Sequence, residues 1–172
     1  MRAKLILSIF LALFMLGASG IKAQRLAYID SQIILKKIPE YAQAQAQIDN
    51  SSKQWESEVS KLRKEIDEME KSYQSEKVLL TPKLQEEKES EIAKKHQEAI
   101  ELQRKYFGPE GELFKKRQTL IQPIQDQIFN AVQDVAQRKR YDMVFDKAGA
   151  ITLLYASKAM DISEEVLQKM GY

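Results

Sequence analysis

The region from Glu40 to Phe107 constrains the fold most strongly, because it contains no glycine and a single proline. Apolar residues recur in it at alternating spacings of four and three, a repeat of about 3.5 residues. This repeat is typical of a coiled coil, in which an apolar seam faces a partner helix. The first seam consists of Trp55, Val59, Leu62, Ile66, Met69 and Tyr73, and a weaker second seam of Leu84, Ile92, Ala99, Leu102 and Tyr106.

The two seams predict two long helices that pack against each other in antiparallel orientation. Pro39 suits the first position of the first helix, because the N–H that proline lacks would have no partner there. A helix from Pro39 to about Leu79 is roughly 60 Å long at 1.5 Å per residue. Thr81 and Pro82 can cap and begin the second helix. We therefore predict a helical hairpin over residues 39–111 with its tip near residues 78–82.

The returning helix is predicted to be interrupted at Gly108-Pro109-Glu110-Gly111, because two glycines and a proline mark a break or a sharp kink. Helical periodicity resumes at Leu113 and ends near Arg140, and Pro123 is expected to bend this segment. The break is either a hinge at which the hairpin flexes or a fixed bend required by packing. The sequence favours neither interpretation.

Short strands are predicted near both ends of the chain, at residues 26–30, 141–146 and 150–156. The last two are joined by a short glycine-containing turn and are expected to form a β-hairpin. A helix over residues 163–170 closes the chain, with Ser163 as its N-cap and Gly171 as its stop.

Three short strands do not make a stable sheet with covered edges, so pairing with strands of sister subunits is expected. The sequence thus predicts an α+β, mostly helical protein. A long antiparallel coiled-coil hairpin is attached to a small β body, formed by residues 24–38 and 112–172 and completed by oligomerisation. The residues expected to build the oligomerising body are Tyr28, Ile29, Met143, Val144, Phe145, Ile151, Leu153 and Leu154.

Residues 1–23 are predicted to be an export signal, with a basic start, an apolar run over residues 5–16 and a tail of small residues. The run is too short to span a bilayer as a helix, although a retained anchor is the alternative interpretation. Cleavage is expected after Ala23, and cleavage after Gly20 also fits. Removing residues 1–23 takes away three of the 27 basic residues and none of the 25 acidic ones, so the net charge falls from +2 to −1. This balance argues against a nucleic-acid-binding protein and does not indicate contact with a membrane surface.

The sequence shows no arrangement of residues that is typical of a catalytic site. There is no cysteine, so an exported chain lacks both disulfides and a thiol nucleophile. The single histidine, His96, has no neighbours that would complete a metal site or a general base. The glutamate pairs of the second helix are expected to be solvated, and no phosphate-binding loop is present. We expect no enzymatic activity, no cofactor and no metal.

Segments at both ends of the chain resemble the Skp/OmpH family of periplasmic chaperones. They are Leu26-Ala27-Tyr28-Ile29-Asp30, then Val135-Ala136 followed by Arg140-Tyr141-Asp142-Met143-Val144-Phe145-Asp146, and Asp161-Ile162-Ser163-Glu164-Glu165-Val166-Leu167. The resemblance implies a homotrimer with a small β-barrel body and three helical tentacles around a cavity. It also implies that the clients are unfolded outer-membrane β-barrel proteins, held soluble in the periplasm without ATP. Two features depart from the family, namely the near-neutral charge and the break at residues 108–111.

Six residues of the hairpin are candidates for contact with a client. Val78, Leu79 and Leu80 belong to the expected tip, where packing within the turn is the alternative. Tyr73, Tyr106 and Phe107 are candidates for the cavity side, whereas Trp55, Leu62 and Ile66 are expected in the seam. The competing interpretation of the whole chain is a structural coiled-coil spacer or adaptor of a cell-envelope complex, without affinity for unfolded chains.

Overall fold

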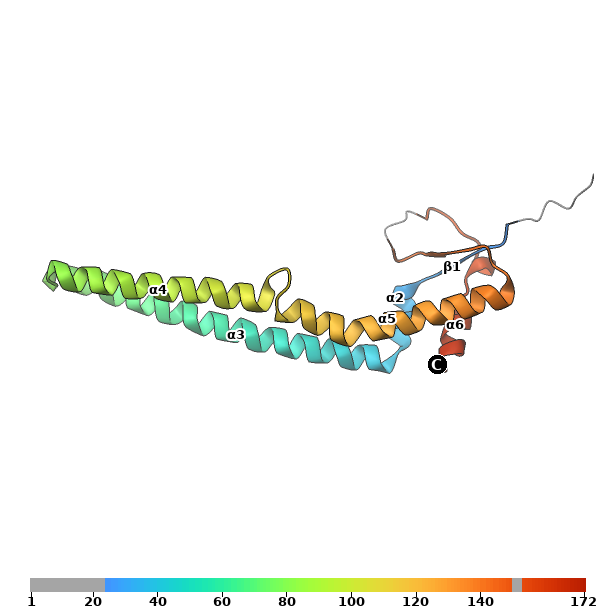
Figure 1. Cartoon of the computed structure of the whole chain (residues 1–172), viewed down its shortest axis with the longest axis horizontal. Helices are drawn as coiled ribbons and strands as arrows, with labels where there is room; N and C mark the ends of the chain where they lie inside the picture. The colour runs from blue at the N-terminus through green and yellow to red at the C-terminus, as the bar shows by residue number, and fades with distance from the viewer. Residues whose placement is uncertain (1–23, 150–152) are drawn as a thin grey trace, which may run out of the picture.

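The computed structural model describes residues 24–149 and 153–172, which form a long helical hairpin and a small body at its open end (Figure 1). The predicted export signal lies outside the described residues. The elements are β1 (Leu26–Ile29), α2 (Ser31–Lys37), α3 (Pro39–Glu76), the 3₁₀ turn η1 (Lys77–Leu79), α4 (Pro82–Phe107), α5 (Glu112–Lys139), β2 (Met143–Asp146), the 3₁₀ turn η2 (Lys158–Met160) and α6 (Ser163–Met170).

Helices α3 and α4 form the predicted antiparallel hairpin (Figure 1). Pro39 occupies the first turn of α3, and the side chain of Thr81 caps α4 by accepting a hydrogen bond from the Leu84 N–H at 3.4 Å. The seam is buried where the sequence places it, at Val59, Ile66, Tyr73, Ile92 and Ala99. The predicted starts of both helices and the burial of these seam residues agree with the structure, whereas Leu84 of the second seam is 45% exposed.

The predicted interruption of the returning helix is also present. Helix α4 ends at Phe107 and α5 begins at Glu112, while α3 runs unbroken beside both of them (Figure 1). The connecting turn is tight, because a Cβ atom on Gly111 would lie 2.8 Å from the carbonyl oxygen of Tyr106 and 2.9 Å from the backbone nitrogen of Gly108. Only glycine fits this backbone approach.

The core of the body is built by β1, α2, the first turns of α3, α5 and α6. Ala44 belongs to this core, so the body extends into a part of α3 that the sequence assigns to the hairpin. Helix α5 continues through Pro123, whose side chain is exposed. The largest fully buried side chains of the core are Ile34, Ile38, Val135, Ile162, Val166 and Leu167.

The sheet has two strands and differs from the prediction. β2 pairs with β1 in parallel, with Leu26 opposite Met143 and Ile29 opposite Asp146. The predicted β-hairpin between residues 141–146 and 150–156 is wrong, because β2 pairs with β1 and residues 153–157 form no strand. The earlier part of the expected third strand, with Ile151, lies outside the described residues. The helical excursion from α2 to α5 works as a long crossover that brings β2 back beside β1 in the same direction.

Helix α6 is confirmed, but the predicted cap is not. Ser163 is the first residue of α6 and Ile162 precedes it without a side-chain cap. The Ser163 hydroxyl instead accepts a hydrogen bond from the Asp30 N–H at 2.9 Å, which ties α6 to the end of β1. Gly171 ends the helix with a positive φ of 94°, as a glycine stop requires.

Candidate functional site

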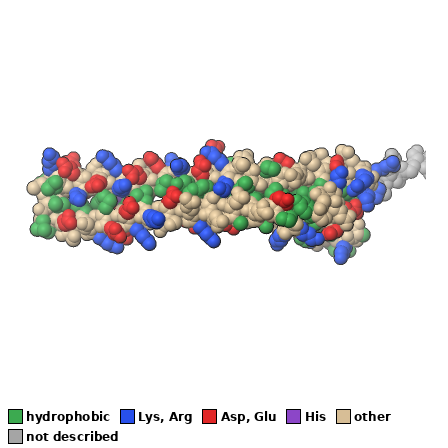
Figure 2. Space-filling view, turned by 90° about the horizontal axis from the view of Figure 1, so that it is seen from below, with side chains coloured by type: hydrophobic (Ala, Val, Ile, Leu, Met, Phe, Trp, Pro, Cys, Tyr) green, Lys and Arg blue, Asp and Glu red, His purple; other side chains and the backbone are tan. Residues whose placement is uncertain are grey.

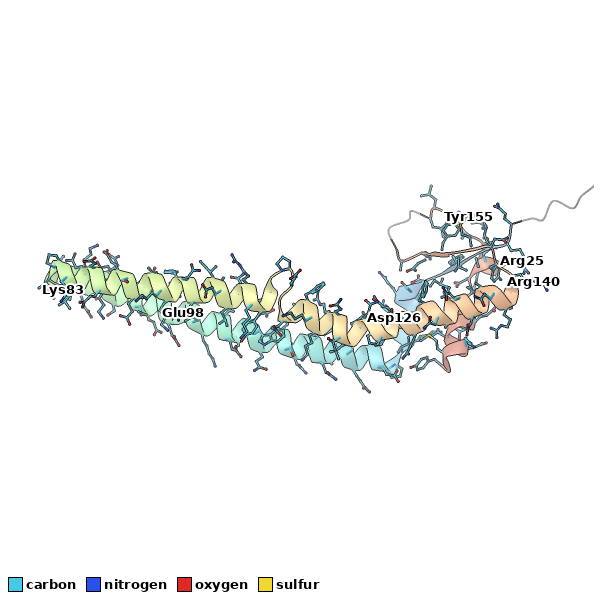
Figure 3. All side chains as sticks on the ribbon, in the orientation of Figure 1. Arg25, Lys83, Glu98, Asp126, Arg140 and Tyr155 are labelled. Atoms are coloured by element: carbon cyan, nitrogen blue, oxygen red, sulfur yellow. The ribbon has the colours of Figure 1, made fainter. Side chains whose placement is uncertain are left out.

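The tip of the hairpin exposes two aliphatic side chains. Val78 is 89% and Leu79 83% exposed, whereas Leu80 is only partly so. The turn beneath them is held by the Gln85 side-chain amide, which donates to the carbonyl oxygens of Lys77 at 2.8 Å and Leu80 at 3.2 Å. Figure 3 places Lys83 at this same end. The tip is thus an ordered turn with an apolar pair at its apex.

Tyr73 is buried in the seam, as its place in the 3.5-residue repeat predicts, and not on the cavity side for which it was also a candidate. It is 5% exposed and packed in the seam, so it does not line a surface that a client could reach. Its hydroxyl donates a hydrogen bond to Glu89 on α4, and Lys77 lies 3.2 Å from the same carboxylate. The hydrogen bond to Glu89 raises the pKa of Tyr73, and the bond from Tyr73, followed by Lys77, lowers the pKa of Glu89. Tyr73 therefore joins the two helices.

Tyr106 and Phe107 belong to an aromatic cluster next to the helix break, on the side toward the tip. The Tyr106 ring stacks on Trp55 of α3 with centroids 5.1 Å apart, and Phe107 meets Tyr106 edge-on at 6.3 Å. The Tyr106 hydroxyl donates to Glu58 at 2.5 Å, and this bond raises the pKa of Tyr106. Both Tyr106 and Phe107 are half-buried. Through Trp55 and Glu58, Tyr106 fastens α4 to α3 near the break.

The residues expected at the oligomer surface divide into two groups. Tyr28 and Ile29 are buried within the protomer, and burial raises the pKa of Tyr28. Met143 and Leu154 are exposed, and Val144, Phe145 and Leu153 are half-buried. Tyr155, beside Leu154, is 85% exposed and stands on the segment that loops out from the body (Figure 3). The sheet region thus presents apolar side chains to solvent.

A groove that the sequence analysis did not identify lies where the hairpin meets the body. It runs between the start of α3 and the first half of α5 and has a volume of about 400 Å³. Its walls include Tyr41, Ile48, Phe114, Gln118, Ile121 and Gln125. The sequence signal that could have revealed it is the lack of charge in residues 41–48 and 118–125. We call this feature the base groove.

The described residues, 24–149 and 153–172, contain no helix that is long and apolar enough to cross a membrane. Within the same ranges, no three or more histidine, cysteine, aspartate or glutamate side chains gather where they could hold a metal ion. His96 lies at an interhelical contact, with its Nε2 atom 2.8 Å from a carboxylate oxygen of Glu70. It links α4 to α3.

Comparison with known proteins identifies the family. The model of the family described as outer membrane protein (OmpH-like) matches residues 25–170. No curated protein sequence gives a significant match. The crystal structure of an OmpH-like protein from Caulobacter crescentus has the same fold, with a TM-score of 0.64 and 17% identity over 87% of this chain and 85% of that one. With the hairpin, the break and the terminal helix in place, the match along nearly the whole chain shows that this protein belongs to the Skp/OmpH-like family of outer membrane protein chaperones.

Proposed function

We propose that the protein is an ATP-independent holdase of the periplasm. Three copies would join through their bodies, and their hairpins would act as tentacles around a cavity that holds an unfolded outer-membrane β-barrel protein until it inserts. The observation that carries this proposal is the family match over residues 25–170, combined with a hairpin that ends in an exposed apolar tip. Residues 1–23 would direct export and then be removed.

The chemistry of such clients explains why a cage of weak contacts suffices. A strand of an outer-membrane barrel is apolar on alternate residues and has unpaired edges until the barrel closes. Several weak contacts on one assembly hold such a chain through effective concentration, without imposing a structure on it. Release then needs no nucleotide, because the inserted barrel is the more stable state.

The body supports assembly into an oligomer. A two-stranded sheet is marginal by itself, and among residues 24–149 and 153–172 no strand pairs with the edge of β2 that faces away from β1. Met143 of β2 is exposed, and so are Leu154 and Tyr155 farther along the chain. Burying these side chains and this edge against sister subunits would stabilise the body and set the hairpins side by side.

The deciding experiment is light scattering on the chain without residues 1–23, alone and after addition of a urea-denatured outer-membrane barrel protein. We expect the mass of a trimer, which then gains the mass of one client and keeps that client soluble. The competing function, a structural spacer or adaptor of the cell envelope, predicts a fixed oligomer that leaves the client to precipitate. That second outcome, or a monomeric protein, would contradict the proposal.

A further inference from the structure

We propose that the base groove is a docking site for uncharged, extended segments of the unfolded client. This inference rests on the proposed function and adds to it the place on each protomer where the client backbone is bound. The groove is formed by the start of α3 and by α5, the helix that follows the break. It therefore lies on the side of the break that is attached to the body, at the opposite end of the hairpin from the tip (Figure 1).

The two helix segments that form the groove are unusually poor in charge. Residues 41–48 and 118–125 contain no charged side chain, although 30% of the whole chain is charged. Arg117 is the one charged residue among those that line the groove. Farther along the hairpin, comparable grooves are lined by Glu56 and Arg63, or by Asp67 and Glu70. Figure 2 shows hydrophobic side chains in patches along the hairpin and near the body, with charged side chains between them.

Neutral walls favour a neutral occupant. A charged wall would lose hydration when an apolar segment covered it, and that loss opposes binding. The membrane-facing residues of a barrel strand are apolar, and the bulk of such a strand is uncharged. A segment of this kind displaces fewer hydrated charges in the base groove than in the two grooves farther along the hairpin.

The glutamines of the groove match the hydrogen-bonding needs of an extended backbone. A side-chain amide offers both donors and an acceptor, as a peptide unit does. Within the part of the chain that the structure describes, the amides of Gln118 and Gln125 form no hydrogen bond with another protein group. Gln45 and Gln122 each donate through Nε2, at 2.8 Å to Asp49 and 2.9 Å to Asp126, and their Oε1 atoms are left as acceptors. These amides can satisfy an unpaired strand without a charged partner.

Apolar side chains supply the rest of the surface. Tyr41 and Ile121 are half-buried and pack against the body core, so their exposed edges are held in place. Phe114 is 50% exposed at the end of the groove nearest the helix break. An apolar client side chain can pack against Phe114 while the client backbone meets the amides. An interface between copies of this chain would need a more apolar centre, because permanent interfaces resemble a protein core.

Site-specific photocrosslinking tests where the client lies. Benzoylphenylalanine is placed at Gln118 in the groove or at Gln47, an exposed residue of α3 that does not line it. The probe is a urea-denatured outer-membrane barrel protein added to the chain without residues 1–23. We expect a client crosslink from position 118 and a much weaker one from position 47. A crosslink from position 118 to a sister subunit, or equal client crosslinks from both positions, would overturn the inference.

Charge variants provide an independent test. Gln118→Glu with Gln125→Glu places two carboxylates in the groove and is expected to weaken client binding about tenfold. Gln43→Glu with Gln47→Glu adds the same charge on the exposed side of α3 and should leave binding unchanged. Phe114→Ala should weaken binding more than Phe129→Ala, since Phe129 is exposed on α5 outside the groove. The scattering mass of each variant without client confirms that its assembly is intact.

The outcomes separate the two proposals. If the unmodified protein holds a client and the groove variants hold it equally well, the base groove is not the docking site and the holdase function stands. If the unmodified protein holds no client, the holdase function fails, and the groove inference fails with it.

Discussion

At the scale of single residues, two tyrosines on opposite helices form hydrogen bonds to carboxylates across the seam. Tyr73 of α3 donates to Glu89 of α4, and Tyr106 of α4 donates to Glu58 of α3. Each bond pairs a phenol at the edge of an apolar seam with an acceptor across it, so the phenol is not left unsatisfied. Because these contacts connect one helix to the other, they favour a single register of the hairpin.

The Tyr73–Glu89 bond makes the stability of the hairpin depend on pH. Glu89 has a pKa below its ordinary value of 4.5, so its contribution is complete above that value and is lost as the pH falls through the lowered pKa. Tyr73 has a pKa above its ordinary value of 10.0, so its contribution is lost as the pH rises beyond that value. The expected profile is a plateau of melting temperature with a fall on both sides.

Tyr73→Phe tests this origin of the pH dependence. Without the hydroxyl, the pKa of Glu89 should return toward its ordinary value, and the melting temperature, followed by circular dichroism, should change less with pH on both the acidic and the alkaline side. Tyr41→Phe serves as the control, because Tyr41 packs against the body core, away from the Tyr73–Glu89 contact. A profile of Tyr73→Phe that matches the unmodified protein would show that other groups produce the pH dependence.

The sequence alone could not decide whether these tyrosines belong to the seam or face a client. Tyr73 follows the seam spacing, yet its polar end and aromatic ring also suit a surface facing a client. Tyr73 can be buried in the seam only if a hydrogen-bond acceptor lies opposite its hydroxyl on the other helix. The register between the two helices determines whether such an acceptor is there, and the sequence alone does not give that register. Ser163 shows the same limit, because its hydroxyl bonds to Asp30 on a distant element instead of capping its own helix.

At the scale of elements, the break between α4 and α5 separates two parts of the hairpin. On the side toward the tip, α4 is fastened to α3 by the stack of Trp55 and Tyr106. On the side toward the body, α5 packs on the start of α3 and on the body core. Helix α3 passes the break without interruption, so movement of the distal hairpin would require bending of α3.

Gly111→Ala should destabilise this break. A Cβ atom at residue 111 would come within 2.9 Å of three backbone atoms, which no side-chain rotation can relieve. The expected cost is about 1–3 kcal/mol in free energy of unfolding, measured by urea denaturation. Gly149→Ala is the matched control, because its Cβ would meet no atom closer than 3.3 Å. Equal losses in both variants would mean that the turn at residues 108–111 adjusts freely.

Helices were easier to predict than strands. The starts of α3 and α4 follow from local signals, namely Pro39 and the Thr81–Pro82 cap, and they agree with the structure. The end of the first helix was predicted less well, because α3 stops at Glu76 and the 3₁₀ turn η1 follows up to Leu79. The partner of β2 depends on where the chain returns after more than a hundred residues. The short separation of residues 141–146 and 150–156 favoured a β-hairpin, but the path of α5 brings β2 beside β1. The base groove was missed because it lies between two uncharged segments that are far apart in sequence. Neither segment by itself indicates a binding surface.

At the scale of the whole molecule, the hairpin separates two uncharged or apolar surfaces by most of its length. The base groove lies beside the body, and the Val78–Leu79 pair stands at the opposite end (Figure 1). The helices between them carry closely spaced Lys and Glu residues, which keep the long surface soluble. A client held at both places would span the hairpin, and each contact would raise the effective concentration for the other.

Replacing the tip pair tests this arrangement. Both side chains are more than 80% exposed, so Val78→Glu with Leu79→Glu should leave helicity and assembly mass unchanged. Losing their apolar contact should speed client release about tenfold or less, because the other contacts persist. Leu80 is the poorer choice, since its partial burial couples it to the turn. Gln74→Glu with Ser75→Glu adds two carboxylates to exposed positions one turn away and controls for charge. Client release is measured after dilution of the complex and should be faster only for the tip variant. Equal release rates from all three proteins would show that the tip does not bind the client. The hairpin would then act only as a spacer for contacts made at its base.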